Sequence, residues 1–275
     1  MSLCMAATCS YKDEPCIVYC VDTAGTRGDS KSEDISKIRD IGGNFVVLAG
    51  NMSDARQLLA VCRPFIAKYQ TGGDDLAITR LKQDLSEAVR IRKREISTSV
   101  LSAELGVTYD EVFNWSQAHP DDPTWRGAWS RIKSLSLEAE LIIGTYTDDE
   151  AAILCIESNG KVTWADHYAA IGTGSNIANA FMSQRPYFDS MSLEDCLFKI
   201  LEAKTAAEKN PYVGKTTMIT LRTPREIFGL GHENTEYMAE QVRDMRKITP
   251  TLAFKEDEMV HLTSSQKRIV YNNNE

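Results

Sequence analysis

Apolar residues alternate with small or polar residues almost from the first position of the chain, a pattern typical of β-strands. Residues 2–9 and 16–22 carry this pattern, and the polar, proline-ended stretch SYKDEP between them predicts a turn. Residues 35–41 and 45–49 predict a second pair of strands, which GGN joins. The N-terminal part of the chain is therefore expected to form two β-hairpins.

Helical periodicity replaces this alternation after residue 50, and it predicts a helix over 51–70 with Ser53 as the N-cap. The apolar face of this helix is expected to consist of Ala55, Leu58, Leu59, Cys62 and Phe65. A stretch from about 74 to 105, rich in Lys, Arg and Glu, predicts a second helix. The next stretch, SQAHPDDPTWRGAW, carries two prolines and two tryptophans. It predicts an irregular segment, an inserted loop at about 100–135.

Strand pairs and helix pairs alternate through the rest of the chain. The expected strands are 139–147, 151–158, 162–174, 216–223, 225–230 and a short tail. The expected helices are 175–184, 192–210 and 233–247. Hairpins rather than single strands alternate with helices, so the sequence predicts a mostly antiparallel sheet layered against helices. We expect an α+β fold in one domain that spans residues 1–275.

Composition and charge narrow the classes of partner. The net charge of −8 argues against nucleic acid and against an anionic membrane, because both favour basic surfaces. No run of about 18 apolar residues predicts a membrane span, and the N-terminus lacks the pattern of a signal peptide. Seven cysteines without a CxxC pair or a nearby His predict reduced, buried thiols in a cytoplasmic protein, with no metal site and no cofactor.

Three familiar motifs fail on inspection. The GKTT stretch lacks the glycine that a phosphate loop needs five positions before Gly214, where Lys209 stands. The stretch IGTGSNIANA lacks the third glycine of a dinucleotide-binding loop. The four histidines form neither HxxxH nor HExxH, and they leave a Ser-His-Asp site open without any feature that favours one.

The first hairpin brings the chain start close to a carboxylate. If its turn centres between Lys12 and Asp13, Asp22 lies opposite Leu3, one residue from Ser2, at a Cβ separation of about 4.5–5.5 Å. A shift of one residue would reverse the faces, and the sequence alone does not fix the register.

The second hairpin supplies a lysine and a glycine. With its turn near Gly43, Lys37 is expected opposite Ala49 and next to Gly50. The amide of Gly50 precedes a helix and could stabilise an oxyanion there. Asp22 and Lys37, taken singly, also fit ordinary solvated charges at strand ends.

These elements resemble the proteasome β-subunit family, including its bacterial relatives. The resemblance rests on IVYCVDTAGT, SKI and AGNMSDA, and later on AIGTGSNIANAFM and EAKTAAEKNPYVG. It covers most of the chain except about residues 100–135. It implies a four-layer αββα sandwich of two antiparallel sheets flanked by helices, and an N-terminal nucleophile (Ntn) hydrolase.

The resemblance also implies roles for particular residues. Asp22 and Lys37 match the acid and the base-tuning lysine of the family, and Gly50 matches its oxyanion glycine. Thr173 and Asn210 stand where the family usually has Ser and Asp. The expected substrate-binding residues, which suggest a preference for an apolar side chain, are Thr26, Leu48 and Met52.

The nucleophile of such an enzyme is the first residue of the mature chain. An alignment without gaps places Ala6 there, which has no nucleophile, whereas four extra residues in the SYKDEP turn place Ser2 there. Removal of Met1 by methionine aminopeptidase would free the α-amine of Ser2. Thr8 is the alternative, and it would need internal cleavage.

Three readings of function follow. The first is a self-assembling, cytoplasmic amidohydrolase, a peptidase that acts on peptides or proteins as a homo-oligomeric ring. The second is a non-catalytic shell or scaffold protein on the same fold, with a degenerate site. The third is an amidase for a small non-peptide amide. The sequence leaves open whether an ATP-driven unfoldase is a partner.

Overall fold

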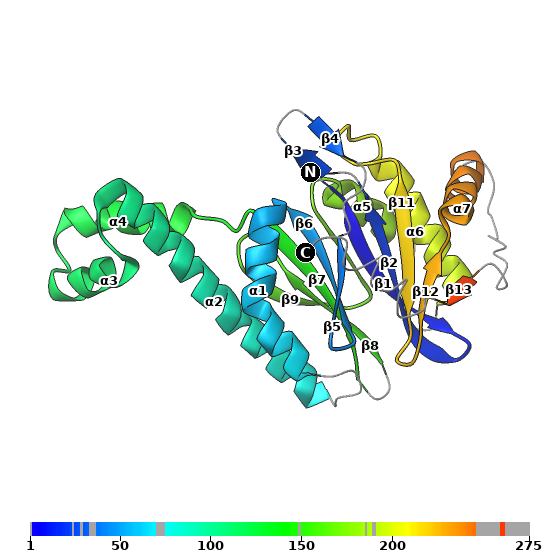
Figure 1. Ribbon diagram of the computed structural model, residues 1–275, viewed down its shortest axis with the longest axis horizontal. Helices are drawn as coiled ribbons and strands as arrows, with labels where there is room; N and C mark the ends of the chain where they lie inside the picture. Colours follow the sequence, from blue (N-terminus) through cyan, green and yellow to red (C-terminus); the bar gives the residue numbers. More distant parts are fainter. Residues whose placement is uncertain are drawn as a thin grey trace.

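The fold is built from two antiparallel sheets with helices on their outer faces (Figure 1). The computed structural model describes residues 2–23, 25–27, 30–32, 37–69, 75–147, 150–184, 186–188, 191–245 and 259–261. The first sheet has the order β10-β1-β2-β11-β12-β13. Its strands are β1 (Cys4–Tyr11), β2 (Glu14–Asp22), β10 (Tyr168–Ile171), β11 (Thr217–Arg222), β12 (Ile227–Leu230) and β13 (Met259–His261).

The second sheet has the order β5-β6-β7-β8-β9. Its strands are β5 (Ile38–Ile41), β6 (Asn44–Gly50), β7 (Ala139–Tyr146), β8 (Ala151–Ile156) and β9 (Val162–Ala165). A separate short pair joins β3 (Gly25–Arg27) to β4 (Ser30–Ser32). The predicted hairpins are thus present. The stretch 162–174, expected as one strand, instead forms β9 in the second sheet and β10 in the first.

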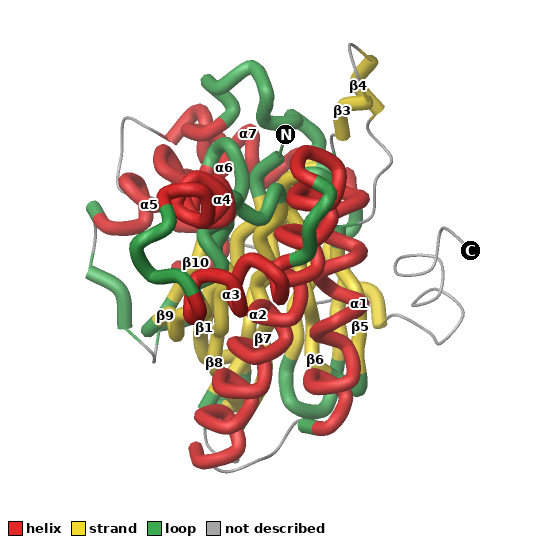
Figure 2. The backbone as a smooth tube through the Cα atoms, turned by 90° about the vertical axis from the view of Figure 1, so that its left-hand side faces the viewer, coloured by secondary structure: helices red, strands yellow, loops and turns green. Residues whose placement is uncertain are grey.

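Helices cover the two outer faces. They are α1 (Met52–Lys68), α2 (Asp75–Leu105), α3 (Tyr109–Ala118), α4 (Pro123–Ser134), α5 (Ser175–Ser183), α6 (Leu193–Ala207) and α7 (His232–Asp244). α1 and α2 lie across the second sheet (Figure 2), and α5, α6 and α7 pack on the first. The predicted four-layer αββα sandwich is confirmed.

Both faces of the central strands are buried, and the alternation of β1 shows how. Leu3, Met5 and Ala7 pack toward the helices α5 and α6, whereas Cys4 and Ala6 pack between the two sheets. Successive side chains of a strand point to opposite faces, so one short segment serves two cores. This explains why small and apolar residues alternate there, with few charges.

The segment after α2 is helical, so the prediction of an irregular loop at about 100–135 is wrong. α3 begins with a capping box in which Thr108 and Glu111 satisfy each other's backbone amides. Pro123 lies in the first turn of α4, where proline removes no helical hydrogen bond. With the end of α2 these helices enclose a small core of Leu101, Val112 and Ala128. Together they project from the body of the molecule (Figure 1).

The helix that follows β6 also differs in detail from the prediction. Its N-cap is Asn51 rather than Ser53, because Asn51 Oδ1 accepts hydrogen bonds from the amides of Ser53 at 2.9 Å and Asp54 at 3.5 Å. Phe65 is only partly buried, and Ile66 occupies the core position that was expected for Phe65. Within the described residues, no helix is long and apolar enough to cross a membrane.

Asn44 ties the second hairpin to the end of α1, and its loss is expected to destabilise the fold. Its buried Nδ2 donates to the carbonyls of Tyr69 at 2.6 Å and Ile66 at 3.3 Å. Asn44→Ala should lower the free energy of unfolding in urea by about 1–3 kcal/mol, because buried carbonyls lose their donor. The exposed Asn176→Ala is the control. An equal effect of both variants would contradict this role of Asn44.

Candidate functional site

The first hairpin has the register that the sequence suggested. Lys12 and Asp13 both have positive φ angles, of 52° and 61°, as a two-residue type I′ turn requires. The strands then pair Cys4 with Val21, and the amide of Asp22 donates to the carbonyl of Leu3 at 3.0 Å. Asp22 therefore lies beside the start of β1.

The second hairpin is shifted by one residue from its expected register. Gly42 and Gly43, both with positive φ, form its two-residue turn, so Ile38 pairs with Val47. Lys37 consequently lies opposite Leu48, not Ala49, and its carbonyl accepts from the amide of Leu48 at 2.9 Å. Two adjacent glycines allow the turn centre to fall between them, and the sequence alone did not show this.

Asp22 and Lys37 form an ion pair that is closed off from solvent. Asp22 is 0% exposed and Lys37 is 1% exposed. Lys37 Nζ donates to Asp22 Oδ1, and the amide of Gly214 donates to Asp22 Oδ2 at 2.7 Å. Removing either partner of such a pair leaves a buried charge uncompensated. Asp22 and Lys37 are therefore not the ordinary solvated charges at strand ends that the sequence also allowed.

Ser2 is buried, and Leu3, the residue after it, contacts Asp22 through the backbone. The residue is 3% exposed, and within the described part of the chain Ser2 Oγ makes no hydrogen bond. The Lys37 ammonium therefore does not reach the hydroxyl directly. A buried hydroxyl without a partner costs free energy, so its position needs an explanation outside stability.

A glycine turn holds the backbone of Ser2. A Cβ built on Gly172, whose φ is +90°, would lie 2.3 Å from the Ser2 carbonyl oxygen and 3.3 Å from the Cβ of Ala49. The amide of Gly172 donates instead to Glu140 Oε2 at 2.7 Å. At Gly172 the gap between the start of β1 and the end of β6 is therefore too small for any side chain.

The thiol of Cys4 connects the start of β1 to Leu48, the residue that pairs with Lys37. Burial raises the pKa of Cys4, and the Lys37 ammonium is the largest influence that opposes this rise. Cys4 Sγ also donates to the carbonyl of Leu48 at 3.2 Å. The beginning of β1, Lys37 and β6 therefore meet at one end of the sandwich.

Gly50 ends β6 and leads into α1. Its φ is +91°, and a Cβ there would lie 2.4 Å from the carbonyl oxygen of Glu138. It is exposed, whereas the other residues of β6 are buried, and Asn51, the N-cap of α1, follows it. The position is a solvent-accessible backbone at a helix N-terminus, which suits the stabilisation of negative charge.

Thr173 and Asn210 contact each other. Asn210 Nδ2 donates to the carbonyl of Thr173 at 3.4 Å, and Asn210 Oδ1 accepts from the amide of Tyr212 at 3.0 Å. The contact joins the turn before α5 to the loop after α6. Thr173 itself is exposed to solvent.

Two of the three side chains expected to bind substrate, Leu48 and Met52, lie in the described part of the chain. Leu48 is fully buried in the core between the second sheet and α1, and Met52 packs partly buried against the same core. The side chain of Thr26 lies outside the described residues. Thr8, the alternative nucleophile, lies within β1, where its hydroxyl donates to the carbonyl of His167 at 3.2 Å.

Sequence reasoning missed two contacts of this site. Gly214 belongs to the rejected GKTT stretch, and its amide turned out to bind Asp22 rather than a phosphate. Glu140, which holds the amide of Gly172, carried no signal in the strand pattern. Within the described ranges, no group of three His, Cys, Asp or Glu residues could hold a metal ion.

The comparison with protein families agrees with this architecture. Residues 133–219 match the family model described as Proteasome subunit. In this segment the chain is similar to proteasome subunits. No curated protein matches it. The matched part of this proteasome-like chain contains Gly172, Asn210 and Gly214 but does not include the two N-terminal hairpins.

At the level of the family, the match makes hydrolase chemistry on an amide bond a possible activity of this proteasome-like chain. The residues that would perform it come mostly from the part outside the match. Their arrangement has to be judged from the geometry above.

Proposed function

We propose that this chain is an amidohydrolase, a peptidase, in which Ser2 becomes the N-terminal nucleophile after Met1 is removed. The observation that carries the proposal is the buried Asp22–Lys37 pair, in which Asp22 also binds the backbone of Leu3, the residue after Ser2. The Ser2 hydroxyl itself makes no hydrogen bond within the described residues. Burying two charges and an unsatisfied hydroxyl together weakens a fold, and such strain concentrates at functional sites.

The α-amine of Ser2 would serve as the general base. A free α-amine has a pKa of about 7.7–8.0, so part of it is neutral near pH 7. The Lys37 ammonium nearby would disfavour a second positive charge on it, and Asp22 holds Lys37 in place. The amine takes the proton of the Ser2 hydroxyl as the oxygen attacks a carbonyl carbon.

The rest of the reaction needs an oxyanion donor and water. The amide of Gly50 would stabilise the negative oxygen of the tetrahedral intermediate. The protonated amine of Ser2 then gives its proton to the leaving amine as the amide C–N bond breaks and an ester remains on Ser2. Water, deprotonated by the same amine, hydrolyses that ester and restores the hydroxyl.

A second candidate is a non-catalytic scaffold on the same fold. It is favoured by the low exposure of Ser2 and by Asn210, which has an uncharged amide where the family usually has a carboxylate. In this reading the Asp22–Lys37 pair would have only a structural role. The two candidates differ in whether Ser2 can be acylated.

Assembly and location belong to the same proposal. The family resemblance supports a homo-oligomeric ring that takes peptides or proteins as substrates, and the partner that would unfold them is left open. All seven cysteines are free and buried. This fits a reducing compartment, so we propose the cytoplasm.

Acylation of Ser2 tests the enzyme directly. The intact mass of the purified protein is expected to lack one methionine residue, and incubation with a β-lactone is expected to add one acyl group. Peptide mapping should place this group on Ser2, and Ser10 in the same N-terminal region should stay unmodified as an internal control. Retention of Met1, or removal of Met1 without any acylation of Ser2, would favour the scaffold.

A further inference from the structure

A lysine that the reaction above does not use is buried behind Asp22. Lys204 lies on α6 and is 1% exposed. Its Nζ donates to Glu208 Oε1 at 2.5 Å and to the carbonyl of Lys215 at 3.3 Å. Fully buried lysines are rare unless their charge is paired, so the partners of Lys204 indicate which part of the structure it stabilises.

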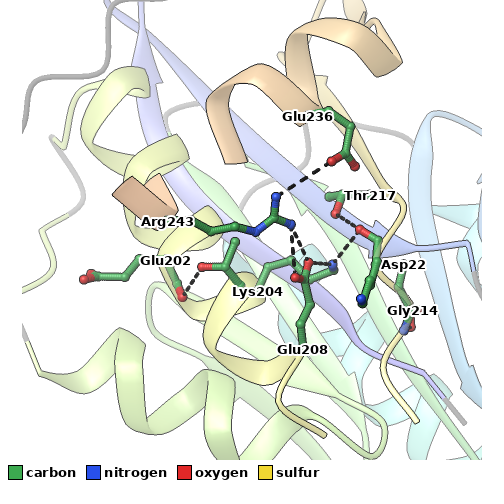
Figure 3. A network of polar contacts seen from close by, with 10 residues as sticks. Asp22, Glu202, Lys204, Glu208, Gly214, Thr217, Glu236 and Arg243 are labelled. Atoms are coloured by element: carbon green, nitrogen blue, oxygen red, sulfur yellow. Dashed lines mark hydrogen bonds and ion pairs between the residues drawn. The ribbon is translucent and has the colours of Figure 1, made fainter. Parts of the chain in front are cut away.

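The carbonyl that Lys204 binds belongs to the segment around Asp22. Thr217 Oγ1 donates to the same Lys215 oxygen at 3.3 Å, and Thr217 is the cross-strand partner of Asp22. The residue before Lys215 is Gly214, whose amide donates to Asp22 Oδ2 at 2.7 Å. Lys204 thus anchors the short segment that delivers a hydrogen bond to the carboxylate (Figure 3).

The other end of this network leads to the outer helix. Glu208 also accepts hydrogen bonds from Arg243 Nη2, at 3.1 Å and 3.4 Å, and Arg243 lies on α7. The side chain of Arg243 is 37% exposed, and Nη1 lies 4.0 Å from Glu236. The buried charge of Lys204 is therefore balanced by an acid that a surface residue helps to hold (Figure 3).

Lys204 also influences the pKa of a thiol on β2. Burial raises the pKa of Cys20 to about 12, and Lys204 is the largest influence that opposes this rise. Cys20 lies on β2, two residues before Asp22. Lys204 is thus near β2, the strand that ends in Asp22. It also binds the carbonyl of Lys215, in the loop that follows α6.

We propose that Lys204 is a positioning residue for Asp22, which acts through the Lys215 carbonyl and the Gly214 amide. This inference rests on the proposed function, since Asp22 in turn orients Lys37 beside Ser2. Lys204 touches neither substrate nor nucleophile. It fixes the loop between α6 and β11, so that one oxygen of Asp22 is held by Gly214 and the other is left for Lys37.

The test compares Lys204→Met with Lys199→Met. Lys199 lies on the same helix and is also buried, but it donates to the carbonyl of Pro186, away from Asp22. Both variants lose a buried charge and its hydrogen bond to a backbone carbonyl, and Lys204→Met also loses the ion pair with Glu208. Lys204→Met is expected to slow acylation of Ser2 by about tenfold relative to Lys199→Met, because the carboxylate loses its fixed position.

The Gly214 amide gives a second readout that a general loss of stability would not produce. With ¹⁵N-glycine in the protein, its proton resonance is expected to move upfield and to exchange faster by about tenfold in Lys204→Met only. Equal acylation rates and an unchanged Gly214 resonance in the two variants would overturn the inference.

The two proposals can fail separately. If the unmodified protein is never acylated, the proposed enzyme fails, and the Gly214 resonance still decides whether Lys204 positions the loop. If the protein is acylated but Lys204→Met and Lys199→Met behave alike in both measurements, the positioning role fails and the enzyme stands.

Discussion

Replacing Lys37 with methionine is expected to abolish acylation of Ser2 and to lower the free energy of unfolding by about 3–5 kcal/mol. Lys37 is 1% exposed, and its ammonium donates to a carboxylate that is 0% exposed. Methionine fills similar volume but leaves the charge of Asp22 without its partner. Urea denaturation measures the stability, and β-lactone labelling measures the reaction.

The double variant Lys37→Met with Asp22→Asn separates the two effects. Asparagine keeps an oxygen that can accept from the Gly214 amide, and no buried charge is left unpaired. The double variant is expected to regain most of the lost stability, because a buried pair replaced as a unit costs little. Acylation should stay absent in both variants. Labelling of Lys37→Met at the unmodified rate would show that the lysine is only structural.

The strands and the first hairpin register could be predicted because local signals determine them. The alternation of small and apolar residues fixes both faces of β1, and a two-residue turn at Lys12 and Asp13 fixes the pairing. The second register was wrong by one residue, since Gly42 and Gly43 tolerate either turn centre equally well in sequence. A short local ambiguity thus moved Lys37 to a new partner.

The helical segment after α2 was missed although its start was readable. Thr108 followed by Glu111 is a capping box, and Pro123 is permitted in a first helical turn. Prolines and tryptophans were given more weight than these signals. The core of this segment contains few buried residues, so its hydrophobic periodicity is weak.

The site itself depends on contacts that no local pattern encodes. Asp22 ends a strand of the first sheet, and Lys37 precedes a strand of the second, so they meet only when the sheets stack. The third contact comes from Gly214, 192 residues further along the chain than Asp22. The resemblance supplied Asp22 and Lys37 as a pair, and only the structure supplied the donor on the other oxygen.

Gly172→Ala is the second variant with a large expected effect, because it acts on Ser2 through the backbone. Its φ of +90° is strained for alanine, and the added Cβ would lie 2.3 Å from the Ser2 carbonyl oxygen. The strain should lower the free energy of unfolding by about 1–3 kcal/mol. The clash should displace Ser2 and slow its acylation by about a hundredfold, as a shift of about 1 Å does to a reacting group.

Gly231→Ala is the matched control for this variant. Gly231 precedes α7, and a Cβ there meets no atom within 4 Å. Its unfolding midpoint in urea and its acylation rate are therefore expected to equal those of the unmodified protein. If Gly172→Ala loses stability but acylates at the unmodified rate, the turn supports the fold alone. If it loses both, the turn holds Ser2 where the proposed reaction needs it, because Gly172 itself offers no side chain to the chemistry.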